Sequence, residues 1–140
     1  MRPISRRSFV SAGVAVFTGL LAAPARARAR LRPPGRVGSA TPSDLVGQFF
    51  SDAAGTRRIG SAYLQLAPTE ASEAALTTAL APAGEDAAQW WGSIDLADLQ
   101  QEVRRRAHRD FKTPDVVDIG GWQLARTEAR LAALWTVTHP

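Results

Sequence analysis

The stretch that decides the fold class is FKTPDVVDIGGWQLARTEARLAALWTV, residues 111–137. The Thr-Pro pair at positions 113 and 114 ends a preceding helix, because proline lacks the amide hydrogen that a helix interior needs. Residues 116–123 predict a short extended segment and turn, or a small hairpin around Gly120-Gly121. A final helix is expected from about 126 to 137, with apolar side chains at helical spacing.

Helical spacing also predicts helices upstream of this stretch. Thr41-Pro42-Ser43-Asp44 is a typical helix start, with a hydroxyl N-cap, a proline at the first helical position and an acid in the first turn. The apolar pattern then continues to Pro68 with an interruption at Gly55-Thr56, which is compatible with two short helices or one kinked helix. A second element is expected to begin at Thr69-Glu70 and to end before Pro82.

A longer helix is predicted between Ser93, as its N-cap, and about Phe111. Its apolar face is formed by Leu96, Leu99, Val103, Ala107 and Phe111. Its arginines lie mostly off that face and are expected to form a solvated surface that Asp95, Asp98 and Glu102 balance; they are Arg104, Arg105, Arg106 and Arg109. The fold class is therefore mainly α: one small helical domain, residues 41–140, with one short β-hairpin or extended segment.

Charge is divided unevenly along the chain. The formal net charge is +4, but eight of the 17 basic residues precede Val37 and all 13 acidic residues follow it. Residues 37–140 therefore carry a formal charge of −4. A basic surface for nucleic acid is accordingly not expected in the domain.

The first 29 residues match a twin-arginine export signal. Ser5-Arg6-Arg7-Ser8-Phe9-Val10 follows the S-R-R-x-F-L motif, in which Arg6, Arg7 and Phe9 carry the signal. The uncharged run 10–23 would rise only about 21 Å as a helix, short of the roughly 30 Å hydrocarbon core, so no stable membrane span is predicted after cleavage. Overlapping Ala-x-Ala sites allow cleavage between 25 and 29, and residues 30–40 predict a flexible linker.

This leader predicts the twin-arginine translocation machinery as a partner and the periplasm as the destination of the folded domain. The alternative is an ordinary basic amphipathic N-terminus. Cysteine is absent, which excludes disulfides, thiolate metal sites, iron–sulfur clusters and covalently attached haem.

Few residues suggest catalysis. The two histidines, His108 and His139, are both expected at the surface rather than in a metal site. A G-x-S-x-G nucleophile motif and glycine-rich phosphate loops are missing. Acidic pairs such as Glu85-Asp86, or Asp115 with Asp118, could form a carboxylate site, but loops and helix starts favour acids in any case. No catalytic, cofactor-binding or metal-binding residue is predicted.

The tryptophans are candidates for contact with a partner. Adjacent tryptophans point in different directions, so one of Trp90 and Trp91 is expected in the core and the other against a neighbouring or partner surface; sugar stacking is a further alternative. Gly121 permits a tight turn before Trp122. The helix that follows begins with Glu128 and Arg130, and its apolar side ends in Trp135.

The run from Asp110 to Leu134 resembles the ending of small twin-arginine-signal proteins that accompany exported oxidoreductases, with the pattern D-F … V-x-V-x-G-W-x-L-S-x-T-E-x-R-L-x-A-L. Such proteins are related to the small subunits of membrane-associated gluconate, sorbitol and fructose dehydrogenases, which this chain resembles in that segment. The resemblance covers about 25 residues and the leader. It departs at Ala125, where a serine would cap the last helix together with Glu128.

The resemblance implies a small chain without a catalytic centre, which escorts a larger cofactor-containing dehydrogenase through the twin-arginine pathway and stays bound to it. The chain itself would then not be an enzyme. The docking residues would be Trp90, Trp91, Trp122, Glu128, Arg130 and Trp135, although the same segment could simply close the domain's own fold. The alternatives are a free-standing periplasmic binding or structural protein, and an enzyme with an acidic site.

Overall fold

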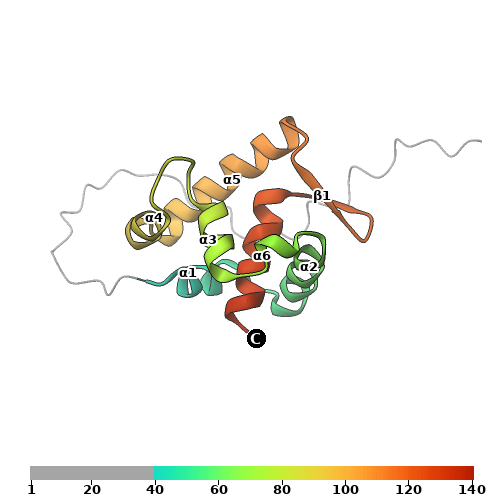
Figure 1. Ribbon diagram of the computed structural model, residues 1–140, viewed down its shortest axis with the longest axis horizontal. Helices are drawn as coiled ribbons and strands as arrows, with labels where there is room; N and C mark the ends of the chain where they lie inside the picture. Colours follow the sequence, from blue (N-terminus) through green and yellow to red (C-terminus); the bar gives the residue numbers. More distant parts are fainter. Residues whose placement is uncertain (1–39) are drawn as a thin grey trace, which may run out of the picture. The chain divides into compact units, whose positions relative to one another are not determined.

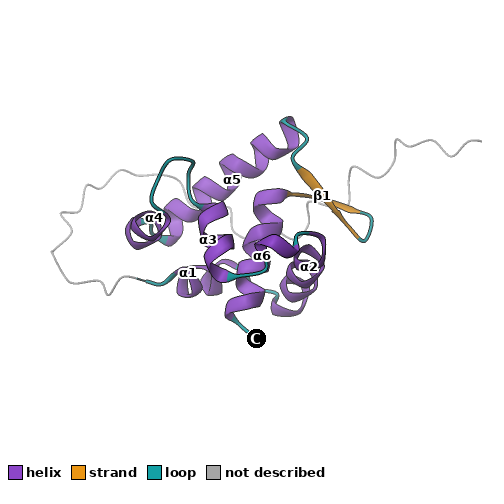
Figure 2. Ribbon diagram, viewed as in Figure 1, coloured by secondary structure: helices purple, strands orange, loops and turns teal. Residues whose placement is uncertain are grey.

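The computed structural model describes residues 40–140, and the mainly α prediction is confirmed for them. Helices alternate with short loops, and two short strands form a hairpin (Figure 2). In chain order the elements are α1 Pro42–Phe49, α2 Ala53–Leu66, the 3-10 turn η1 Pro68–Glu70, α3 Glu73–Leu80, α4 Ala87–Ser93, α5 Leu96–Lys112, β1 Val116–Ile119, β2 Trp122–Ala125 and α6 Arg126–Thr138.

The last helix, α6, forms the centre of the domain, between α2 and α3 (Figure 1). It also contacts α1, α5 and the hairpin. A helix that is covered on nearly all sides must be apolar around most of its circumference. Accordingly, five consecutive side chains of α6 are buried: Leu131, Ala132, Ala133, Leu134 and Trp135.

The most extensive contact between helices is that of α2 with α6, and Gly60 allows their close approach. A Cβ atom at this position would overlap the carbonyl group of Ala132 and the hydroxyl of Thr136. The absence of a side chain at Gly60 therefore sets the distance between the two helices.

Side-chain caps define where the helices begin. The predicted start of α1 is confirmed: Thr41 and Asp44 form a capping box, with Pro42 at the first helical position. The chain then breaks into two helices rather than one kinked helix. The break lies at 50–52 and not at Gly55-Thr56, because the Asp52 side chain accepts the Gly55 amide hydrogen and starts α2 there.

The other two upstream boundaries also differ from the prediction. Thr69-Glu70 belongs to the 3-10 turn, and α3 begins later, where Ser72 caps it. Ser93 does not cap the long helix: it ends α4, and Asp95 caps α5 by accepting the Asp98 amide hydrogen at 2.9 Å. An aspartate cap replaces the predicted hydroxyl cap.

The face that α5 buries is rotated slightly from the predicted one. Leu99, Val103 and Ala107 are buried as expected, but Phe111 is 53% exposed and its neighbour Asp110 is only 8% exposed. Asp110 is drawn inward because its carboxylate has a partner on α6, described below. The hydrophobic pattern alone predicts that Phe111, and not Asp110, is the buried residue.

The predicted hairpin is confirmed and extends to Ala125. The strands are antiparallel, with Val117 opposite Leu124 and Ile119 opposite Trp122. The connecting residues Gly120 and Gly121 have φ values of 60° and 86°, the positive values that a two-residue type I′ turn requires at both positions.

Candidate partner-docking site

One face of the hairpin is apolar, and it runs from the core to the protein surface. Val117 and Ile119 point to the same side of β1, and their partners Leu124 and Trp122 lie opposite them on that side. Val117 is buried, and Ile119 and Leu124 pack against the core. Trp122, beside the turn, is 58% exposed. It is therefore the point at which this apolar face leaves the core and reaches the surface.

The hairpin holds Trp122 in a defined place. The Asp118 side chain accepts the Gly121 amide hydrogen at 2.9 Å across the turn. At the other end of the hairpin, the Asp115 carboxylate pairs with the Arg126 guanidinium at 2.5 Å. The two acids considered as a carboxylate site thus each have a structural partner.

The tryptophan pair in α4 divides its roles as predicted between core and edge. Trp91 is 2% exposed, and its indole nitrogen donates a hydrogen bond to the Thr77 carbonyl at 3.1 Å. Trp90 is partly buried and packs edge-to-face against it, with ring centroids 4.8 Å apart. The Arg106 guanidinium lies 6.0 Å from the Trp90 ring centroid. Trp91 is therefore a core residue, which corrects its assignment as a docking residue.

Trp135 is also a core residue rather than a docking residue. It is 7% exposed and stacks on His139, with ring planes inclined by 8° and centroids 5.0 Å apart. The Arg57 guanidinium covers the indole at 5.4 Å. His139 is expected at the surface but is partly buried, because its ring is stacked on Trp135.

Arg130 is committed to an intramolecular ion pair. Its guanidinium binds both carboxylate oxygens of Glu70, at 2.7 and 2.8 Å, and Glu70 also accepts the Tyr63 hydroxyl at 2.8 Å. The Tyr63 side chain is fully buried. Arg130 holds the pKa of Glu70 below its usual range, and burial raises the pKa of Tyr63. This cluster fastens the 3-10 turn and α2 to α6.

Glu128 lies at the start of α6 and is partly buried. Burial raises the pKa of its carboxyl group, and the nearby Asp110 charge adds to the rise. The Ala125 backbone amide opposes this effect by hydrogen bonding. Glu128 thus lies against Ala125 and near Asp110 at the start of α6.

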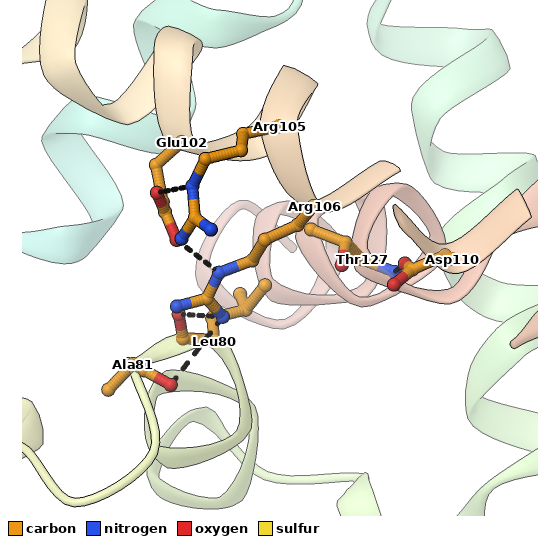
Figure 3. Close-up of polar contacts among 7 residues, drawn as sticks. All are labelled: Leu80, Ala81, Glu102, Arg105, Arg106, Asp110 and Thr127. Atoms are coloured by element: carbon orange, nitrogen blue, oxygen red, sulfur yellow. Dashed lines mark hydrogen bonds and ion pairs between the residues drawn. The ribbon is translucent and has the colours of Figure 1, made fainter. Parts of the chain in front are cut away.

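Two side chains of α5 reach the ends of two other helices and cap them (Figure 3). Asp110 accepts the Thr127 amide hydrogen at 2.9 Å, in the first turn of α6. One turn earlier, Arg106 donates to the Leu80 carbonyl at 2.9 Å, at the end of α3. Glu102 holds Arg106 in place at 2.6 Å. These caps are not evident from the sequence, because each joins residues far apart in the chain.

Of the predicted docking residues, the structure leaves Trp122 as the strongly exposed one and does not bring the six together into one surface. Trp91 and Trp135 are in the core, Trp90 lies at its edge, and Glu128 and Arg130 face neighbouring elements. The export-signal residues Arg6, Arg7 and Phe9 lie outside the described residues.

Open depressions lie on the surface of residues 40–140. One, of about 480 Å³, lies between α4 and α5 beside Trp90, Asp98 and Glu102, and another, of about 540 Å³, lies over α2. Within residues 40–140, no group of three or more acidic or histidine side chains is placed to hold a metal ion. None of the helices described there has the length and apolar character needed to span a bilayer.

Comparisons of the chain with models of protein families, with curated proteins and with solved structures returned no match.

Proposed function

We propose that the protein is a non-catalytic accessory subunit, which carries a larger cofactor-containing dehydrogenase through the twin-arginine pathway and stays bound to it in the periplasm. The exposed Trp122 carries the proposal. Tryptophan is enriched at the energetic centres of protein interfaces, where its large ring is desolvated. In this chain it stands within the segment that resembles the ending of such subunits.

The hairpin supports docking because it presents Trp122 at low entropic cost. The turn, the Asp118 hydrogen bond and the buried Val117 hold the backbone before any partner arrives. Pre-organised anchors lose little conformational freedom on binding, so more of the contact energy appears as affinity. The partner is expected to offer an apolar pocket that receives the indole ring.

The leader supports the same role from the other end of the chain. The twin-arginine route transports folded proteins. A small acidic domain with no evident cofactor site has no evident need to fold before export. A partner that must acquire its cofactor in the cytoplasm has that need. Arg6 and Arg7 would then direct the complex, and Trp122 would hold the cargo.

The test separates these two tasks in cells that express the full chain with the larger enzyme that co-purifies with it. R6K/R7K should leave both proteins in the cytoplasm. W122A should still be exported but should leave the enzyme behind. L66A is the matched control, because Leu66 is also strongly exposed, at 60%, but lies on α2; it should export the enzyme normally.

Periplasmic enzyme activity and the amount of each protein in both compartments give the result. Active enzyme in the periplasm of the R6K/R7K strain would refute the escort role. Normal enzyme export with W122A, in a domain that folds as wild type by circular dichroism, would refute docking through the hairpin.

A further inference from the structure

The outward side of α5 is cationic from Arg104 to Lys112, over about its last two and a half turns. Arg104, Arg105, His108, Arg109 and Lys112 are all exposed, and Phe111 lies on the same side with 53% of its surface accessible. At 100° per residue these six positions cover the half of the helix opposite Leu99, Val103 and Asp110. We call these six residues the α5 outer stripe.

The acids of α5 neutralise fewer of its basic side chains than the sequence suggests. Asp95 is the N-cap of α5 and Asp98 lies in its first turn, two turns before Arg105, with which it lines one surface depression. Glu102 pairs with Arg105 and Arg106. Among residues 40–140, Arg104, Arg109 and Lys112 have no carboxylate within ion-pair distance.

Helix electrostatics explains only part of the stripe. Cations in the last turn are favoured by the negative end of the helix dipole, an effect that fades within one turn. This accounts for Arg109 and Lys112, the basic residues of the last turn. Arg105 is explained by its ion pair with Glu102, but neither effect accounts for Arg104 or for the exposed Phe111 on the same side of the helix.

We propose that the α5 outer stripe binds the anionic headgroups of a phospholipid bilayer surface. Helices that lie on membranes combine lysine and arginine with an aromatic side chain that enters the boundary between headgroups and acyl chains. Phe111 supplies that side chain. The proposal does not depend on the escort role, since it concerns direct contact of the domain with lipid.

A planar surface also suits the charge of the whole domain. Residues 37–140 are acidic overall, at −4, so a polyanion that wrapped the domain would be repelled. A compact domain of this length has a radius of gyration of about 13 Å and is therefore about 33 Å across, whereas charges in physiological salt are screened beyond about 8 Å. On a flat bilayer the stripe therefore meets the lipid, while acids that lie farther than this from the lipid surface are screened.

The chain contains no cysteine, so a single introduced cysteine can be labelled specifically. H108C places a nitroxide in the middle of the stripe, and S61C places one on the exposed side of α2. Both labels are attached to the full chain and mixed with vesicles of phosphatidylglycerol and phosphatidylcholine. Because the leader is present in both proteins, it cannot by itself produce a difference between the two positions.

The label at position 108 should lose access to an aqueous relaxation agent on anionic vesicles and not on pure phosphatidylcholine, whereas the label at 61 should stay accessible. Each surface cation contributes about a fivefold change in membrane partition. R104Q/R109Q should therefore raise the lipid needed for half of the response at 108 by about 25-fold. R57Q/R58Q removes the same charge from α2 and should leave this value unchanged.

Equal protection at 108 and 61, no protection at either, or an equal effect of the two charge variants would overturn the proposal. So would protection at 108 that requires the larger enzyme and is absent with vesicles alone, because the stripe would then face a protein.

Discussion

The Asp110 carboxylate accepts the Thr127 amide hydrogen at 2.9 Å, so a residue near the end of α5 caps the first turn of α6. The first amides of a helix have no partner within the helix and need an acceptor from elsewhere. Ala125, at the N-cap position, has no side-chain oxygen to offer. The cap that the sequence lacks locally is thus supplied across the fold, by a buried carboxylate that also benefits from the positive end of the α6 dipole.

D110A should lower the free energy of unfolding by about 1–2 kcal/mol, because it leaves the Thr127 amide buried without an acceptor. D110N keeps an oxygen at the same place and should lose less. Urea unfolding followed by circular dichroism measures both variants. If D110A proves as stable as wild type, water or another group must satisfy the helix start instead.

Glu128 should make the domain less stable as the pH rises. Its pKa in the folded state is raised above the ordinary value of 4.5, so the folded protein holds this proton more tightly than the unfolded chain does. The stability that the protonated carboxyl group contributes is therefore complete below that value and is lost as the pH rises through the folded pKa. E128Q cannot ionise, so its stability relative to wild type should increase as the pH rises above about 4.5. Parallel pH dependences of the two proteins would show that the carboxyl is not perturbed.

How far the sequence predicts the fold depends on the range of the interaction. The capping box of Thr41 and the turn at Gly120-Gly121 use residues three or fewer apart, and both are visible in the sequence. The start of α5 is not, because Ser93 and Asp95 are equally suitable caps. Choosing between them requires knowing that Trp91 already belongs to a separate helix.

The candidate site is less predictable for the same reason. A tryptophan predicts an anchor but not whether the anchor faces the core, so Trp91 and Trp122 could not be distinguished from spacing alone. The exposure of Phe111 follows from the inward turn of Asp110, and that turn depends on an amide 17 residues away. Contacts of this length emerge only after the helices are packed.

Glu70 should give a pH dependence opposite to that of Glu128. Its pKa is lowered, first by hydrogen bonding to Arg130, so its stabilising contribution is present above 4.5 and is lost as the pH falls through the lower folded pKa. E70Q should cost about 1–2 kcal/mol at neutral pH, the modest value expected for a partly exposed pair. The cost should shrink in acid. Y63F removes one hydrogen bond and should cost less than E70Q at neutral pH.

Arg105 and Arg106 share Glu102 but should differ in their effect on stability. Arg106 is mostly buried and also caps the end of α3 through the Leu80 carbonyl, so R106A should cost about 1–2 kcal/mol. Arg105 makes an exposed i,i+3 pair with 60% of its side chain accessible, and R105A should leave the melting temperature unchanged. Equal losses in the two variants would mean that the carbonyl contact does not stabilise α3.

Gly60 should be the glycine least tolerant of substitution in the helices. A Cβ atom there would meet the α6 backbone at Ala132, so G60A must push α2 away from α6 and should cost about 1–3 kcal/mol. G92A is the matched control, because nothing lies within 4 Å of a Cβ atom at Gly92 in α4. Alanine is a better helix former than glycine, so G92A should be neutral or stabilising by up to about 1 kcal/mol. Thermal unfolding of the two variants tests the packing directly: a loss in G92A equal to that in G60A would place the cause in the helix backbone, whereas a loss confined to G60A assigns it to the α2–α6 contact.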